Sequence, residues 1–364
     1  MPPIAATALV TAPKASPELA AEAVREALER AGTDIARGVL LFLSAEFARI
    51  VQPAVLAASR VARSMQVVGC TAPGIFTEAD WILDRPAACA MVFGGSVAVG
   101  PPDEDGARAT LTLALPQAAG AAWIAARPRR FGMLSADGAA QNPGRIWVRA
   151  KPAAEGIAEA AITGARSAIA VSRGLRRLNE PAPVDRAEGY DLHRVGGHPA
   201  LATLLRELPL ELREMVRLPH HLLFAGVMGA DAGETPAQER FDLVPVIAAN
   251  AEDRSVTLGG RIEPGSRLFW CMRQPLAAER DTRVALDAAA AGLDAAPDFG
   301  VVFSCVGRGP YFFGGPDRDL EILRERFPGM PFIGAYGAGE IGTLASGSRL
   351  LLNSAVFALF RRDV

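Results

Sequence analysis

One pattern, found near each end of the 364-residue chain, constrains the fold more than any other feature. In each copy a helix is followed by a wholly apolar strand, a second helix, a Gly-rich turn and another apolar strand. The first copy contains VLLFLS (Val39 to Ser44) and VVGCTAPGIF (Val67 to Phe76), and the second contains GVVFSC (Gly300 to Cys305) and PFIGAYGAGEIG (Pro331 to Gly342). Continuous apolar strands are typical of sheets buried on both faces. The chain is therefore predicted to contain two related α/β halves.

The two Gly-rich turns also align at one constant offset. This alignment pairs Gly69 with Gly334, Gly74 with Gly339, Ala90 with Ala355, and Met91 with Val356. Apolar strands and glycine turns occur in most α/β proteins, so the alternative is coincidence. A duplication predicts the same strand order in both halves, whereas a coincidence does not.

The segment between the halves has a different sequence pattern from both of them. Short strand candidates and turn residues alternate there, as in SAIAVS at Ser167, HHLLFAGVM at His220 and RLFWCM at Arg267. A helix is expected near Pro199, capped by His198, and the proline-containing stretch from Glu180 to Asp191 is the best internal boundary. We expect one domain over residues 1–180 and another over 181–364, with a strand-rich segment at 190–275. The fold class is α/β to α+β, with mixed sheets.

Composition excludes several classes of partner. The formal net charge is -2 and only 6% of residues are aromatic, so neither a basic surface nor a stacking platform for nucleic acid is expected. The longest apolar runs are shorter than the roughly 20 residues of a membrane-spanning helix. The N-terminal MPPIAATALV does not have the form of a signal peptide, and the four cysteines form no CxxC pair. We expect a cytoplasmic protein that inserts into no membrane.

The motifs of the second copy are more specific than a generic α/β pattern. FSCVGRGPYFFGGPDRD, from Phe303 to Asp319, precedes PGMPFIGAYGAGEIG and RLLLNSAVFALF, and together they closely resemble the C-terminal domain of the FIST family. VVGCTAPGIFTEADW looks like the matching N-terminal domain, and HRVGGHPAL is similar to the segment that joins the two. The chain departs from the common pattern at Val306, where an Asn is frequent, at Leu175, where a Cys is frequent, and at Asn353, where a His is frequent.

The resemblance implies a bacterial sensory protein in signal transduction that binds a small ligand, with amino acids among the candidates. No kinase, receiver or cyclase domain is attached, so a stand-alone sensor with a separate output protein as its partner is expected. Some relatives are thought to carry haem, which keeps a haem-based gas sensor as an alternative, although the leading expectation is a protein without a cofactor.

The residues themselves suggest where a ligand binds. Ligands of α/β folds bind outside the carboxyl ends of strands, and glycines there allow close backbone approach. Arg308 can clamp a carboxylate, and Glu340 can bind an amine, so the two suit an amino-acid zwitterion. The alternative is a structural ion pair between Arg308 and a nearby acid such as Glu340, and Tyr336 is either a wall of the site or a packed aromatic. The predicted ligand-binding residues are Cys305, Gly307, Arg308, Gly309, Tyr336, Gly339, Glu340, Gly69, Cys70 and Gly74.

A cysteine-dependent enzyme is the other alternative, with Cys305 or Cys70 as the nucleophile. Neither residue has a general base beside it in sequence, although such groups assemble in space. Cys89 and Cys271 lie inside strand candidates and are assigned to the core. All four histidines fall between His193 and His221, but their spacing matches no zinc motif. No catalytic residue and no metal ligand is therefore predicted.

Overall fold

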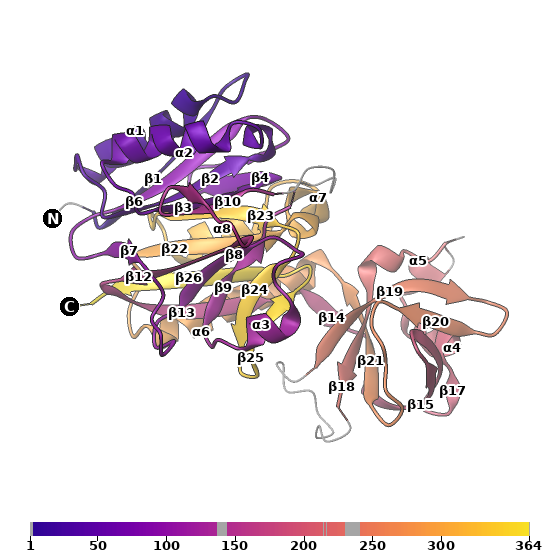
Figure 1. Ribbon diagram of the computed structural model, residues 1–364. Helices are drawn as coiled ribbons and strands as arrows, with labels where there is room; N and C mark the ends of the chain where they lie inside the picture. The colour runs from indigo at the N-terminus through magenta and orange to yellow at the C-terminus, as the bar shows by residue number, and fades with distance from the viewer. Residues whose placement is uncertain (1–2, 137–143, 214, 216, 230–240, 364) are drawn as a thin grey trace. The chain divides into compact units, whose positions relative to one another are not determined.

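The computed structural model describes residues 3–136, 144–213, 215, 217–229 and 241–363 of the chain (Figure 1). The chain forms two compact units, Met1–Arg173 with Asp281–Val364 and Gly174–Arg280. The sequence domains expected to meet at residue 180 divide the chain differently, and that division stays a prediction. The stretch from Glu180 to Asp191 contains strand β15 (Ala182–Glu188) of the second unit. The mixed α/β to α+β fold class is confirmed.

The first copy of the pattern forms a mixed sheet in which the strands follow one another as β1-β6-β2-β3. Strand β2 is parallel to β3, and β6 is antiparallel to both β1 and β2. The sheet continues through β10 (Ile146–Val148) and β11 (Lys151–Pro152). Its other elements are β1 (Ala5–Thr11), α1 (Pro17–Ala31), β2 (Gly38–Ser44), η1 (Ala45–Phe47), α2 (Val51–Ala62), β3 (Val67–Ala72) and β6 (Ala87–Phe93).

The second copy repeats this arrangement as β13-β26-β22-β23. Strand β22 is parallel to β23, and β26 is antiparallel to both β13 and β22. The equal strand order and directions confirm the predicted duplication. The second unit follows β13 in sequence and ends within α6. The elements of this copy are β13 (Ala165–Ser172), α6 (Pro275–Gly292), β22 (Phe299–Cys305), η3 (Val306–Arg308), α7 (Pro310–Phe313), α8 (Arg318–Arg326), β23 (Phe332–Gly337) and β26 (Ala355–Arg362).

The constant offset holds at the glycines but fails at the last strand. Gly69 lies opposite Leu41 in the first sheet, and Gly334 lies opposite Val302 in the second. Leu41 in turn pairs with Ala90, whereas Val302 pairs with Phe357. The counterpart of Ala90 is therefore Phe357. The predicted pairing of Ala90 and Met91 with Ala355 and Val356 is wrong by two residues, because the second copy has a longer connection before its last strand.

The strands that follow β3 and β23 in sequence leave the sheets of their own copies. Strands β4 (Gly74–Thr77) and β5 (Trp81–Leu83) follow β3 in sequence, but β4 pairs with β23 of the second sheet. Strands β24 (Glu340–Leu344) and β25 (Gly347–Leu351) follow β23 and extend a third sheet, ordered β25-β24-β9-β8-β12-β7. The remaining elements there are β7 (Ala98–Gly100), β8 (Thr110–Ala114), α3 (Ala121–Ala125), β9 (Arg130–Leu134) and β12 (Ile157–Thr163).

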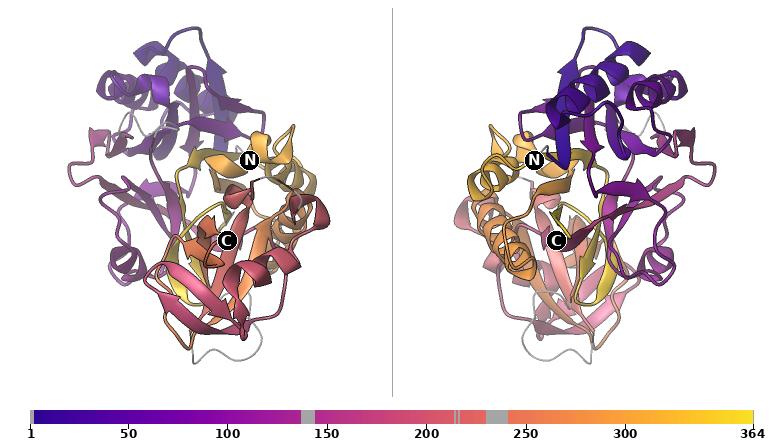
Figure 2. Two further views of the ribbon diagram at one scale, coloured as in Figure 1. Left: turned by 90° about the vertical axis from the view of Figure 1, so that its right-hand side faces the viewer. Right: turned by 90° about the vertical axis from the view of Figure 1, so that its left-hand side faces the viewer.

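The first unit is layered as helices, sheet, sheet and helices. Helices α1 and α2 lie side by side on the outer face of the first sheet (Figures 1 and 2). The inner faces of the two sheets meet in one apolar cluster, where the rings of Phe42 and Phe303 make a T-shaped contact at 5.7 Å. Residues of α6 and α8 cover the outer face of the second sheet. Both apolar strands β2 and β22 are therefore buried on two faces, as their sequences predict.

The helix ends test the capping residues that were predicted from the local sequence. The Ser16 side chain accepts a hydrogen bond from the Leu19 backbone N–H, and Gly32 ends α1 in the left-handed conformation, as predicted. Helix α4 (Ala200–Glu207) begins after Pro199 without a side-chain cap, so the prediction that His198 caps it is wrong. His198 instead pairs with Val195 in a short strand, β17 (His198–Pro199).

The second unit is a closed antiparallel sheet. Its pairings run β21-β15-β16-β20-β19-β18 and return from β18 to β21, so six strands form a ring around Trp270. The indole N–H of Trp270 donates to the Thr203 hydroxyl at 3.0 Å. The other elements are β14 (Leu175–Arg177), β16 (Asp191–Val195), α5 (Leu210–Arg213), η2 (His220–Leu222), β18 (Leu223–Met228), β19 (Asp242–Asn250), β20 (Ser255–Leu258) and β21 (Arg267–Arg273).

Candidate functional site

Arg308 is buried in a dense polar network just beyond the end of β22. Its Nε and Nη2 atoms donate to the two carboxylate oxygens of Asp319 at 2.7 and 3.1 Å. Its Nη1 donates to the Ser172 carbonyl at 2.9 Å, and Nη2 also donates to the hydroxyls of Ser172 at 2.6 Å and Thr282 at 3.1 Å. Burial alone would lower the pKa of Arg308, but the neighbouring carboxylates, led by Asp319, raise it. Every nitrogen of the guanidinium therefore donates to the protein itself.

This geometry corrects one expectation from the sequence. The acid suggested as the partner of Arg308 was Glu340, but the buried ion pair is formed with Asp319. Asp319 lies in the first turn of α8 and accepts a further hydrogen bond from Thr282 at 2.5 Å. A direct contact between Arg308 and a ligand stays a prediction, and the existing bonds leave the guanidinium little capacity for one.

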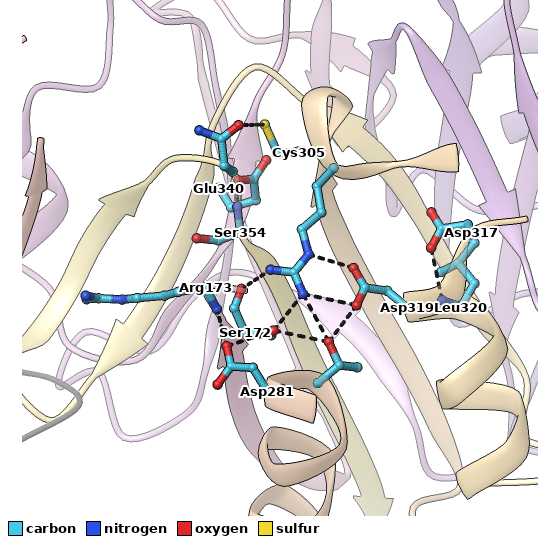
Figure 3. A network of polar contacts seen from close by, with 12 residues as sticks. Ser172, Arg173, Asp281, Cys305, Asp317, Asp319, Leu320, Glu340 and Ser354 are labelled. Atoms are coloured by element: carbon cyan, nitrogen blue, oxygen red, sulfur yellow. Dashed lines mark hydrogen bonds and ion pairs between the residues drawn. The ribbon is translucent and has the colours of Figure 1, made fainter. Parts of the chain in front are cut away.

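The same network joins the two points where the chain leaves the first unit and returns to it. Asp281 accepts hydrogen bonds from the Arg173 backbone N–H at 2.6 Å and from the Ser172 hydroxyl at 3.0 Å. Figure 3 shows these bonds together with those to Asp319. Arg308 also bonds Ser172 on one side and Thr282 on the other. Residues on both sides of the inserted unit are thus bonded to one another.

Tyr336 is a packed aromatic with a buried hydroxyl. It lies opposite Gly74 in the β4–β23 pairing, and a Cβ atom on Gly309 would come within 2.9 Å of its ring. Its hydroxyl donates to Asp317 Oδ2 at 2.6 Å, and Asp317 Oδ1 caps α8 by accepting from the Leu320 backbone N–H. Of the predicted site residues, Gly74, Gly309 and Tyr336 are therefore brought together, and the glycines make room for the ring.

The carboxyl group of Asp317 provides a test of this arrangement. Burial, with a contribution from neighbouring Asp319, raises the pKa of Asp317 to about 7. Because this pKa is raised in the folded state, its contribution to stability is complete below the ordinary pKa of Asp and is lost as the pH rises through about 7. We expect a loss of about 1.4 kcal/mol per pH unit at most. Urea unfolding between pH 4 and 8 should show a steeper decline for the wild type than for Asp317→Asn, and equal slopes would contradict the assignment.

Glu340 and Cys305 meet around the backbone of Ser354. The Ser354 N–H donates to Glu340 Oε2 at 3.3 Å, and the Ser354 carbonyl accepts from the Cys305 N–H at 3.0 Å (Figure 3). Glu340 is 0% exposed, and its other oxygen, Oε1, has no hydrogen-bond partner in the part of the chain that the structure describes. Burial raises the pKa of Glu340 well above its ordinary value. The Cys305 sulfur lies 3.9 Å from Asn353 Oδ1. An unsatisfied buried carboxyl is costly, so this group is unusual.

The duplication shows how the two copies differ at this position. Aligned through the sheet pairings, Cys305 corresponds to Ser44, and Ser354 corresponds to Ala87. In the first copy the Ala87 N–H donates to the Ser44 hydroxyl at 3.0 Å. In the second copy Glu340 accepts from the equivalent N–H. In the second copy the Glu340 carboxyl thus takes the place of the Ser44 hydroxyl as hydrogen-bond acceptor. It also places an ionisable group at the end of β22.

This difference predicts unequal effects of alanine at the two equivalent positions. Ser44→Ala leaves the buried Ala87 N–H without its acceptor and should cost about 1–3 kcal/mol in the free energy of unfolding. Cys305→Ala leaves the Ser354 N–H bonded to Glu340, so it should cost about 1 kcal/mol or less. Urea unfolding of both variants measures the difference. A cost for Cys305→Ala equal to that of Ser44→Ala would show that Glu340 does not take over the bond.

Two of the residues predicted in the first copy lie elsewhere. Gly69 and Cys70 lie in β3, between β2 and β10 of the first sheet. A Cβ atom on Gly69 would come within 1.7 Å of the Leu41 carbonyl oxygen, so close strand packing explains this glycine. Cys70 lies in the apolar cluster between the sheets, and burial raises its thiol pKa, which disfavours the nucleophilic thiolate. All four cysteines are buried and none forms a disulfide.

The two remaining predicted glycines follow the ends of β22 and β23 in sequence. Gly307 lies in η3, and Gly339 lies directly before β24, where its carbonyl accepts from the Leu134 N–H at 2.8 Å. Sequence reasoning missed Asp317 and Asp319. The signal that could have identified them is the sequence PDRD, which places both acids at the start of a helix. An acid side chain at that position is expected to cap the helix N-terminus.

The described residues give no support to a metal centre. They contain no group of three or more His, Cys, Asp or Glu side chains placed to hold a metal ion. None of the helices they form is both long and apolar enough to cross a membrane.

Comparison with known proteins identifies one domain of known type in this chain. Residues 200–343 match the FIST C domain. This domain is of a sensory type, and the match includes Cys305, Arg308, Tyr336 and Glu340. An uncharacterized protein of Mycobacterium tuberculosis is 32% identical over 206 residues, which is 56% of this chain and 54% of the relative. An uncharacterized protein of Mycobacterium bovis is 30% identical over 210 residues, or 57% and 54%. The chain thus spans about half the length of these curated relatives.

Proposed function

We propose that this chain is a FIST-family sensory protein that binds a small ligand at the strand ends of the second copy, around Glu340. The FIST C match supports a sensory role. The first-copy sequence VVGCTAPGIFTEADW, which resembles the N-terminal FIST domain, supports membership of the whole chain. Amino acids and related metabolites are the ligands to test first. The signalling output then belongs to a separate protein, and a cytoplasmic location fits these roles.

One observation carries this proposal. Glu340 is fully buried, and its Oε1 has no partner among the described residues. A buried polar atom without a hydrogen bond costs about 1–3 kcal/mol, which a bound ligand would recover. Glycines at 337 and 339 flank this position, and a Cβ atom on Gly337 would come within 2.9 Å of the Met133 side chain and 3.4 Å of Glu340 Oε1. The unsatisfied carboxyl oxygen supports the binding of a small polar molecule here.

A thermal-shift screen against amino acids and related metabolites tests the proposal. A ligand at 100 times its dissociation constant should stabilise the fold by about 2.7 kcal/mol. Glu340→Gln should remove the shift, because the variant loses the carboxylate. Glu46→Gln is the matched control, since Glu46 is exposed just beyond the equivalent strand of the first copy. A shift that survives in Glu340→Gln would place the ligand elsewhere, and a screen without any shift would remove the proposal.

A further inference from the structure

The polar network of the second copy contains more acids than bases. Arg308 lies among the carboxylates of Asp319, Asp281 and Asp317, and it is also the charged group that acts on Glu340. Arg173 contributes its backbone N–H to Asp281, while its guanidinium points away from the network (Figure 3). When Glu340 is ionised, its negative charge lies in the same region as these aspartates, which favours a cation beside it and disfavours an anion.

Arg308 is poorly placed to receive an anionic ligand. Its guanidinium is 1% exposed, and it forms a two-bond contact with Asp319. A ligand carboxylate would have to displace that carboxylate or the Ser172 and Thr282 oxygens, and each displaced group would lose a charge-assisted hydrogen bond. The paired use of Arg308 for a carboxylate and Glu340 for an amine, expected from the sequence, stays a prediction, and the existing bonds of Arg308 disfavour its half of that pair.

Glu340 is different, because one of its oxygens is already used and the other is not. Oε2 accepts from the Ser354 N–H, which fixes the orientation of the carboxyl, and Oε1 has no partner among the described residues. A carboxylate oxygen accepts hydrogen bonds and does not donate them. When Glu340 is ionised, the complementary group on a ligand is therefore a hydrogen-bond donor, and the charge of the carboxylate favours a donor with a positive charge.

We propose that the ligand group recognised by Glu340 is a cationic nitrogen, a primary ammonium or a guanidinium, and that the ligand needs no carboxylate. The inference rests on the proposed function and specifies the ligand class for the same site. It predicts binding by amines, diamines and amino-acid derivatives that have lost the carboxyl group. It also predicts that an acid without an amine does not bind.

Protons provide a second signature of this binding mode. Burial favours the protonated form of Glu340 in the empty site. Because a cation requires the carboxylate, binding should release a proton, and the affinity should rise by up to about tenfold per pH unit below the pKa of Glu340. A neutral ligand that accepts a hydrogen bond from the protonated carboxyl would show the opposite dependence.

Two matched sets of compounds test the inference on the full-length protein. Amino-acid amides keep the ammonium and lack the carboxylate, whereas N-acetyl amino acids keep the carboxylate and lack the ammonium. We expect thermal stabilisation by one or more amides and none by the N-acetyl compounds. Calorimetry of the best amide at pH 6, 7 and 8 should show increasing affinity and an enthalpy that depends on the ionisation heat of the buffer. Glu340→Gln should weaken binding at least tenfold, and Glu46→Gln should leave it unchanged.

The possible results separate the two proposals. Stabilisation by N-acetyl compounds but not by amides would overturn the cationic-ligand inference and leave a small-ligand sensor in place. No stabilisation by either set or by the free amino acids would overturn both. If Glu340→Gln fails to fold, proton release by the wild-type protein still decides the question, and binding of an amide without proton release would overturn the inference.

Discussion

Arg308→Ala should lower the free energy of unfolding by about 3–5 kcal/mol, because it leaves Asp319 buried without its charged partner. Arg308 and Asp319 are each 1% exposed, so water cannot replace the lost bonds. The substitution also removes donors from the Ser172 carbonyl and from the Thr282 hydroxyl. Urea unfolding monitored by tryptophan fluorescence and by circular dichroism measures the loss.

A surface ion pair provides the control for this prediction. Arg326 and Asp287 lie 2.6 Å apart, but both side chains are about half or more exposed, so Arg326→Ala should cost about 1 kcal/mol or less. The double variant Arg308→Met with Asp319→Leu should recover much of the stability, since it removes both buried charges. A cost below about 1 kcal/mol for Arg308→Ala would contradict a structural ion pair and would return Arg308 to the list of ligand-binding candidates.

Gly334→Ala should be the most disruptive glycine substitution in the second sheet. A Cβ atom at this position would come within 2.1 Å of the Val302 carbonyl oxygen and 2.2 Å of the Phe76 ring. Because one of these atoms belongs to the backbone of the neighbouring strand, rotation of a side chain cannot remove the clash. We expect a loss of about 3 kcal/mol or more, or failure to fold. The midpoint of thermal unfolding measures it.

Gly300→Ala is the matched control, since Gly300 lies in the adjacent parallel strand β22. The closest atoms to its added Cβ would be 3.4 Å away, an ordinary contact distance. Its substitution should change stability by about 1 kcal/mol or less. Similar losses in both variants would show that the sheet tolerates no added methyl at either position, and the specific role of Gly334 would then be wrong.

The sequence predicts those parts of the fold that depend on neighbouring residues. The helix capped by Ser16 and the buried strands β2 and β22 follow from local patterns, and the duplication follows from their repetition. The pairing of β4 and β5 with the second sheet does not follow from such patterns, since strand pairing depends on contacts far apart in sequence. Both sheets contain apolar strands, so the apolar sequence of β4 does not indicate which sheet it joins.

For the candidate site, the sequence predicts that two charged side chains are buried, but it does not predict which residues they bond. Burial of Arg308 and Glu340 follows from their apolar, glycine-containing surroundings, because a charge there requires partners. The identity of those partners does not follow. Ser172 lies before the inserted unit and Thr282 after it, so no sequence window contains both. The local signal that was available is the acidic start of α8, where Asp317 caps the helix and Asp319 reaches Arg308.

The position of the inserted unit sets the order of events during synthesis. Strand β13 leaves the ribosome before the whole of Gly174–Arg280, yet its partner β26 follows that unit and most of the second copy in sequence. At about 5–20 residues per second, β13 remains unpaired for roughly 10–40 s. An unpaired apolar strand can associate with other chains during such a delay. The exposed Arg166 on β13 is a charge of the kind that protects strand edges. The nascent chain therefore depends on this strand remaining soluble until β26 has been synthesised.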